Sequence, residues 1–249
     1  IKRQEMRKIY LDHIAATPLH PLALESMLPF LKESFGNPQS PHSAGQEAAA
    51  AVEQAREQTA QLINAHPSEI LFTASGSESN NFALKGLALA HQSRGTNIVL
   101  SAIEHQSVLH SAKSLEKLGF SVTLVGVDKY GIVSPAEFEK AISKETVLAS
   151  IMLANSEVGT IEPVKEIAQV CRSRNVLFHT DAVAAVGNIP VDVRELGADT
   201  LSLAANEFYG PKGAAALFIK KGTRILPFID GGIQEGGRRA GTENVAGIV

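Results

Sequence analysis

The sequence predicts an α/β fold, with a mostly parallel seven-stranded sheet, helices on both faces and one domain over residues 1–249. From residue 69 onward, short β-branched runs alternate with amphipathic stretches, which is the pattern of strand–helix–strand units. The chain has 249 residues and is 44% hydrophobic, which is enough to bury a full core. The sequence contains no repeat and no low-complexity linker that would divide the domain.

Seven segments have the length and the β-branched content of buried strands. They are 69–73, 97–101, 121–125, 147–153, 176–180, 200–203 and 214–219. The connections between these strands have helical apolar spacing. Pro135 and Pro163 begin two of the helices, where proline is suited because the N–H groups of the first turn have no partner within the helix. The expected helices are 21–33, 44–62, 79–90, 107–118, 135–142 and 163–172.

Composition excludes several classes of function. The net charge of -3 provides no basic field for nucleic acid. No apolar run reaches the roughly 18 to 20 residues of a membrane helix, and no apolar block near the first residues resembles a secretory signal. The single cysteine, Cys171, lies in an apolar helical stretch and is expected to be a core residue rather than a reactive thiol. We therefore expect a cytoplasmic protein without nucleic-acid or membrane partners.

Small residues follow the first predicted strand and lead directly into a helix. Open α/β sheets bind ligands at the carboxyl ends of their strands, so this turn is a candidate binding site. The N–H groups near Gly76 and Ser77, the serine hydroxyl and the positive end of the helix dipole suit a phosphate. The same residues also suit an ordinary helix cap.

Polar side chains also follow three later strands. His105 comes after the strand at 97–101 and could stack on a flat ring or transfer a proton. Asn155 follows the strand at 147–153 and offers an amide donor. Asp181 follows the strand at 176–180. Each alone suits a turn, but their repetition at strand ends favours a built site. With a phosphate site, these groups match pyridoxal phosphate, whose ring nitrogen needs an acidic partner.

Several segments, in order over nearly the whole chain, resemble those of a known family. That family is the cysteine desulfurases of the NifS/IscS type, within the class V aminotransferase group of fold type I pyridoxal phosphate enzymes. The segments are YLDHIAATP (10–18), FGNPQSPHSAG (35–45), GSESNN (76–81), EHQSVL (104–109), NSEVGTIEPV (155–164), HTDAVAAVG (179–187), FYGPKG (208–213) and GGRRAGTENV (236–245).

The resemblance implies a role for each candidate residue. Gly76 and Ser77 would hold the cofactor phosphate, and His105 would stack on the pyridine ring and serve as a catalytic residue. Asn155 would meet the phenolic oxygen, and Asp181 would pair with the ring nitrogen. The implied reaction converts L-cysteine to L-alanine and an enzyme persulfide, which supplies sulfur for iron–sulfur cluster assembly.

The resemblance also implies partners and a second domain. Thr242 would reach the phosphate of the other subunit of a homodimer, and a sulfur-acceptor or iron–sulfur scaffold protein would bind. Family members continue past the GTEN segment into a small domain that carries the nucleophilic cysteine, whereas the present sequence stops at Val249. We expect residues 1–35 to form an N-terminal segment and helix that packs toward such a domain.

Four residues around the expected cofactor depart from the family pattern. Glu207 occupies the position of the Schiff-base lysine, and Asn206, still expected in the cofactor site, replaces the preceding histidine. Ala204 replaces a phosphate-binding serine, and Ala184 replaces a glutamine. A carboxylate cannot form a Schiff base. Lys212, five residues after Glu207, sits in the GPKG turn and is not expected to substitute for the missing lysine.

Two readings follow for the function. One is a cysteine desulfurase, present as a fragment or variant with impaired catalysis. The other is a non-catalytic homologue that keeps the fold and acts as a scaffold or regulator of sulfur or cluster transfer. We expect no metal site, because beside Glu207 only His105 and Asp181 are plausible ligands.

Overall fold

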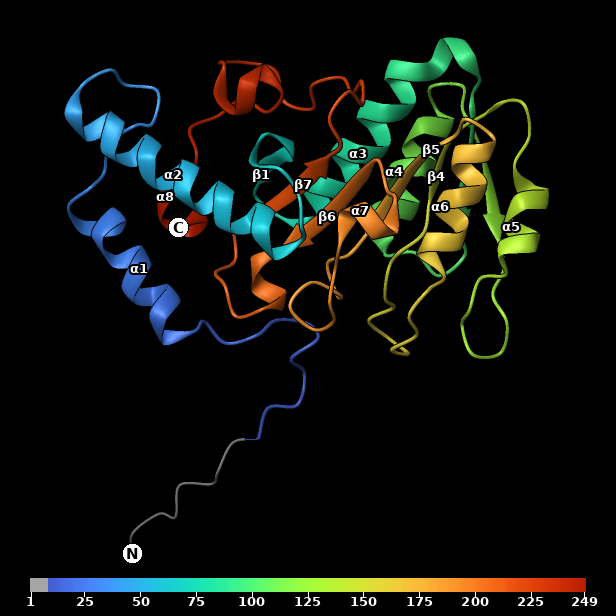
Figure 1. The fold of residues 1–249 in the computed structure, drawn as a ribbon, viewed down its shortest axis with the longest axis horizontal. Coiled ribbons are helices and arrows are strands. Elements are labelled where there is room, and N and C mark those ends of the chain that lie inside the picture. Colours follow the sequence, from blue (N-terminus) through green and yellow to red (C-terminus); the bar gives the residue numbers. More distant parts are fainter. Residues whose placement is uncertain (1–8) are drawn as a thin grey trace, which may run out of the picture.

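The computed structural model describes residues 9–249 and has a seven-stranded sheet between two layers of helices (Figure 1). The strand order is β1-β7-β6-β5-β4-β2-β3. Strand β7 runs antiparallel to β1 and β6, and all other neighbours are parallel, so the predicted fold class is confirmed. The strands are β1 (Ile70–Thr73), β2 (Asn97–Ser101), β3 (Ser121–Val125), β4 (Thr146–Ser150), β5 (Leu177–Asp181), β6 (Thr200–Ala204) and β7 (Ala215–Ile219).

The six predicted helices are all present, together with two short ones that the sequence pattern did not predict. The helices are α1 (Pro21–Lys32), α2 (Ser43–Leu62), α3 (Gly76–His91), α4 (Gln106–Glu116), α5 (Pro135–Ala141), α6 (Val164–Ser173), α7 (Val193–Leu196) and α8 (Val245–Ile248). The four-residue helices α7 and α8 are too short to show a helical period. Within residues 9–249, no helix is long and apolar enough to cross a membrane.

Two element boundaries differ from the prediction by three residues, and the others differ by no more than two. Helix α3 begins at Gly76 rather than at residue 79, because the Ser75 hydroxyl accepts the Glu78 N–H at 3.1 Å and caps the first turn. Strand β4 ends at Ser150 rather than at residue 153. Its neighbour β2 ends at Ser101, so beyond that point only the β5 side of the ladder supplies hydrogen-bond partners.

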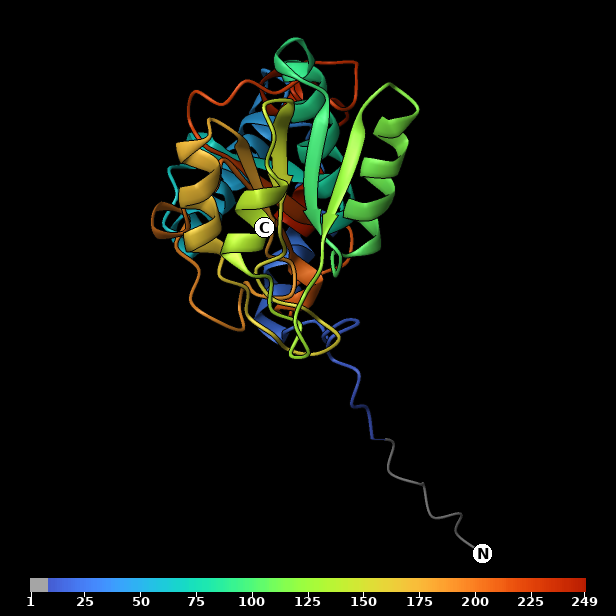
Figure 2. The same ribbon diagram turned by 90° about the vertical axis from the view of Figure 1, so that its right-hand side faces the viewer.

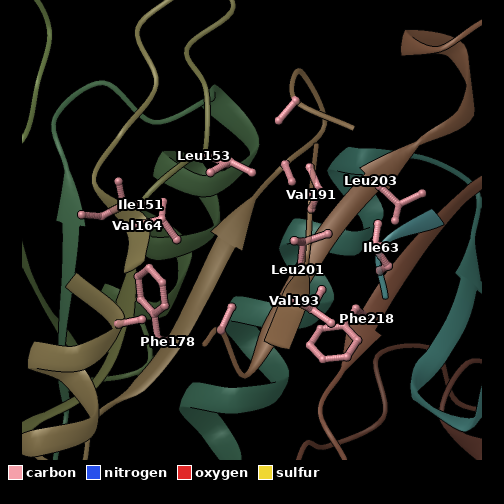
Figure 3. Packing of buried hydrophobic residues seen from close by; sticks show 14 of the residues in the cluster. Ile63, Ile151, Leu153, Val164, Phe178, Val191, Val193, Leu201, Leu203 and Phe218 are labelled. Atoms are coloured by element: carbon pink, nitrogen blue, oxygen red, sulfur yellow. The ribbon is translucent and has the colours of Figure 1, made fainter. Parts of the chain in front are cut away.

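Both faces of the sheet are buried, each under its own layer of helices. Along β7, Ala216 and Phe218 belong to one core cluster, whereas Leu217 and Ile219 belong to the other. Helices α3 and α4 supply the second cluster, and α2, α5 and α6 supply the first (Figures 1, 2 and 3). This two-sided burial explains why the strands are continuous hydrophobic runs.

Cys171 lies on α6 in the first of these clusters and is fully buried. Burial raises the pKa of its thiol to about 12, so the side chain is neutral at physiological pH. The expectation that Cys171 is a core residue is therefore confirmed.

The segment before α1 is attached to the loop that follows β6. The Thr17 N–H donates to the Asn206 carbonyl at 2.9 Å, and the Thr17 hydroxyl accepts the Tyr209 N–H at 2.6 Å. Helix α1 then packs against α8 (Figure 1). Residues 1–8 of the predicted N-terminal segment lie outside the described residues, and packing of 1–35 toward a second domain stays a prediction.

Candidate functional site

A cavity of about 340 Å³ lies where β1, β2, β4, β5 and β6 end. This edge of the sheet is where open α/β folds bind ligands. Of the predicted site residues, the cavity brings together Gly76, Ser77, His105, Asp181 and Asn206. The other lining residues are Ile14, Ala15, Ser75, Asn80, Met152, Ala154, Ser156, Val183, Ala184, Ala204 and Glu207.

One end of the cavity is formed by the first turn of α3. A Cβ atom at Gly76 would lie 2.6 Å from Val183 Cγ2, so only glycine allows the helix to start this close to the loop after β5. Within residues 9–249, the N–H groups of Gly76 and Ser77 donate to no protein acceptor. Together with the helix dipole, these free donors suit an anion, and the predicted phosphate-binding role of Gly76 and Ser77 stays a prediction.

Asp181 lies deep in the cavity at the end of β5 and is 5% exposed. Its Oδ2 accepts a hydrogen bond from Asn80 Nδ2 at 2.7 Å, and its Oδ1 accepts the Val183 N–H at 3.0 Å. Burial raises the pKa of Asp181, while the two hydrogen bonds and the nearby His105 lower it. The carboxyl group is therefore held in one orientation, and its pairing with a ring nitrogen stays a prediction.

Asn80 organises this end of the cavity, a role that the sequence did not indicate. Its amide group also donates to Ser107 Oγ at 2.9 Å, and its Oδ1 lies 3.1 Å from His179 Nε2. Because the amide hydrogens face Asp181, His179 Nε2 must carry a proton and donate it to Asn80 Oδ1. Burial lowers the pKa of His179 to about 3, so the imidazole is neutral.

His105 lies at the edge of the cavity and caps α4. Its Nδ1 accepts the Ser107 N–H at 3.1 Å and lies 2.7 Å from Ser107 Oγ. The imidazole is exposed and lines the cavity, which is where a ring that stacks on a ligand must lie. This placement agrees with the position expected for His105, and the stacking and catalytic roles stay predictions.

Asn155 and Thr242 do not line the cavity. The Asn155 amide donates to the Ile103 carbonyl at 3.2 Å and to Met152 Sδ, and its Oδ1 accepts two N–H groups of its own turn. Its side chain thus stabilises the loop after β4. Thr242 is exposed and lines a separate small cavity beside α8, so its expected contact with a second subunit stays a prediction.

Glu207 lines the cavity on the short 3-10 turn η3 (Ala205–Glu207) that follows β6. Its Oε1 accepts a hydrogen bond from Asn206 Nδ2 at 2.7 Å. Burial raises the pKa of Glu207, and the negative charge of Asp181 acts in the same direction. Lys212 is exposed and lies outside the lining, which contains no lysine or arginine among the described residues.

Metal ligands do not converge in the described part of the chain. Within residues 9–249, no group of three His, Cys, Asp or Glu side chains has the arrangement needed to hold a metal ion.

Glu104 is a second buried carboxyl group near Asp181, and the sequence pattern assigned it no role. It is 4% exposed and accepts the Met152 N–H at 2.8 Å, and the Ser101 and Ser150 hydroxyl groups donate to it. Burial raises the pKa of Glu104 from 4.5 to about 7, and the charge of Asp181 adds to this effect. Glu104 thus joins the ends of β2 and β4 beneath the cavity.

The raised pKa of Glu104 predicts a specific pH dependence of stability. Between pH 4.5 and about 7 the folded state binds the proton more tightly than the unfolded state, so this contribution is fully present below pH 4.5 and is lost as pH rises through about 7. Glu104→Gln keeps the shape and removes the ionisation. We expect it to raise the free energy of unfolding by on the order of 2 kcal/mol at pH 8, with little effect at pH 5. Urea denaturation at both values measures the difference, and an equal effect at both would refute it.

Comparisons with known proteins identify the family of this chain. Residues 9–249 match the family model "Aminotransferase class-V". The cysteine desulfurase IscS of Dictyoglomus turgidum is 53% identical over 98% of this chain, and that of Methanosarcina thermophila is 49% identical over 98%. The aligned region is 62% and 61% of those relatives, so the chain spans about three fifths of their length.

Solved structures give the same result. A NifS-like protein superposes with a TM-score of 0.95 and 43% identity, covering 97% of this chain and 67% of that one. The structure of SspA in complex with cysteine superposes with a TM-score of 0.94 and 39% identity, covering 97% and 70%. The chain therefore belongs to the class V aminotransferase family and, within it, to the NifS/IscS type of cysteine desulfurases.

Proposed function

We propose that this chain is a cysteine desulfurase homologue whose own cavity does not carry out desulfuration, and that it acts as a non-catalytic scaffold or regulator of sulfur or cluster transfer. The observation that carries this proposal is Glu207, which lines the cavity at the position where the family has its Schiff-base lysine. A Schiff base requires a primary amine, and no lysine lines the cavity among the described residues.

The cavity fits pyridoxal phosphate only in part. Asp181 suits the ring nitrogen, and the free N–H groups of Gly76 and Ser77 suit the phosphate. Ala184 and Ala204, however, place methyl groups in the lining where the family has polar side chains. Because the covalent link is also absent, the residues present do not fit a covalently held cofactor, and we derive no catalytic step through it.

The charge of Glu207 gives no favourable contact to an aldehyde or to a phosphate. Asp181 and Glu207 line the same cavity, and its side chains include no lysine or arginine within residues 9–249. A second carboxylate close to an anionic phosphate costs on the order of 1 kcal/mol even when the charges are partly screened. Asn206, which replaces a histidine, neutralises none of this charge.

What the chain keeps is its architecture. The sheet, both helical layers and the GTEN segment at 241–244 are those of the family, and these are the parts from which a homodimer and a surface for a sulfur-acceptor protein would be built. We propose both partners on this basis. L-cysteine, which is bound to SspA in one of the similar structures, is the small molecule to test at the cavity.

An absorbance titration of the purified protein with pyridoxal phosphate tests the proposal, followed by borohydride reduction and peptide mass mapping. We expect no lysine adduct and no alanine released from L-cysteine. An adduct on a lysine such as Lys212, together with alanine production, would overturn the proposal and make the chain an active desulfurase.

A further inference from the structure

The cavity described above has an unusual charge for a site that would hold a phosphorylated ligand. Its lining carries two carboxyl groups, Asp181 and Glu207, and one imidazole, His105. Within residues 9–249 the lining offers no lysine or arginine to balance them. A ligand that complements this cavity must therefore carry a positive charge next to the carboxyl groups, and any anionic group of the ligand must lie away from them.

Glu207 lies on a backbone turn that two hydrogen bonds hold in place. Its turn is closed by the Ala205 N–H, which donates to the Ala214 carbonyl at 3.0 Å, and by the Gly210 N–H, which donates to the Ala205 carbonyl at 2.8 Å. The Asn206 amide occupies Glu207 Oε1, whereas Oε2 accepts no hydrogen bond within the described residues. One carboxylate oxygen is thus free to accept a proton donor from a ligand in the cavity.

Two other parts of the cavity, at Asp181 and at the first turn of α3, suit different chemical groups of a ligand. Asp181 is held by Asn80 and by the Val183 N–H, and it suits a protonated ring nitrogen. The N–H groups of Gly76 and Ser77 suit a phosphate. A phosphorylated pyridine with a primary ammonium group on the side of Glu207 has all three features, and a cavity of about 340 Å³ is within the range that holds one small ligand.

We propose that the cavity binds pyridoxamine 5′-phosphate, the amine form of the cofactor, without a covalent bond, and that Glu207 pairs with its ammonium group. An aldehyde has no hydrogen-bond donor for a carboxylate, whereas an ammonium group donates a charge-assisted hydrogen bond to it. The replacement of lysine by glutamate thus changes the preferred ligand from the aldehyde form to the amine form. This inference rests on the proposed function, since both require that position 207 carries no amine.

Isothermal titration calorimetry of the purified protein with pyridoxamine 5′-phosphate and with pyridoxal phosphate tests the inference. We expect the amine form to bind at least about tenfold more tightly. Glu207→Gln keeps the size of the side chain and removes its charge, and should abolish this preference. The matched control Glu166→Gln, on the exposed side of α6, should leave it unchanged. Equal affinities in the wild type, or a preference that survives Glu207→Gln, would overturn the inference.

Failure of the inference can be told apart from failure of the proposed function. If the proposed function fails, borohydride traps pyridoxal phosphate on a lysine of the wild-type protein. If only the inference fails, no adduct forms and the two ligands bind equally or not at all.

Discussion

Glu207→Lys is expected to give a protein that binds pyridoxal phosphate covalently at position 207. The position lines the cavity, the ring-nitrogen partner Asp181 is already held in place, and the N–H groups of Gly76 and Ser77 are free. Covalent capture of the aldehyde requires an amine, and a lysine at position 207 supplies it. The expected result is a new visible absorbance band on adding pyridoxal phosphate and, after borohydride, about one cofactor per chain on the peptide that contains position 207.

A surface variant controls for nonspecific reaction of lysines with the aldehyde. Glu166→Lys places the same amine on the exposed side of α6, outside the cavity lining, and should give neither the band nor a stoichiometric adduct. If Glu207→Lys behaved like this control, the cavity would not be the cofactor site of this chain. Ala204 and Ala184 remain unchanged in the variant, so covalent capture is the readout rather than restored turnover.

Phe178→Ala is expected to lower the free energy of unfolding by about 3–5 kcal/mol. Phe178 lies on β5, is 1% exposed and belongs to the core cluster beneath α6, with Ile151 and Val164 (Figure 3). Removing the ring leaves a cavity that close-packed neighbours fill only partly. Because Asp181 lies three residues further along the same strand, the variant should also weaken ligand binding at the cavity. Urea denaturation gives the change in stability.

The exposed Phe35 provides the control for this core variant. Its side chain is 85% exposed, so Phe35→Ala should change the free energy of unfolding by no more than about 0.5 kcal/mol. A loss below about 1 kcal/mol for Phe178→Ala would mean that the cluster beneath α6 repacks around the missing ring.

Hydrophobic pattern was sufficient to predict the sheet, and chain topology to predict the place of the site. The central strands, buried on both faces, appear as apolar runs such as 215–219, and polar residues that follow the parallel strands meet at one edge because those strands end together. The ends of α3 and β4 were less predictable, since they depend on a cap at Ser75 and on where a neighbouring strand stops.

Within the site, sequence reasoning identified residues by their distance from strand ends and therefore missed those that act from a helix. Asn80 lies one turn into α3, on its buried side, and its importance depends on contacts with Asp181 and His179 that are about a hundred residues away in sequence. The same reasoning placed Asn155 at a strand end, but its side chain bonds to its own loop and to the Ile103 carbonyl rather than facing the cavity. Such pairings are set by three-dimensional packing, which short-range sequence patterns do not encode.

The antiparallel strand β7 has an evolutionary consequence. Ala204 at the end of β6 pairs with Ala215 at the start of β7, so the ten residues between them leave the sheet and return to it at the same place. Substitutions inside this closed loop can accumulate while every strand pairing is inherited intact. Positions 206 and 207, which line the cavity, can thus change without altering any strand pairing, so the residues of this loop describe the site independently of the fold.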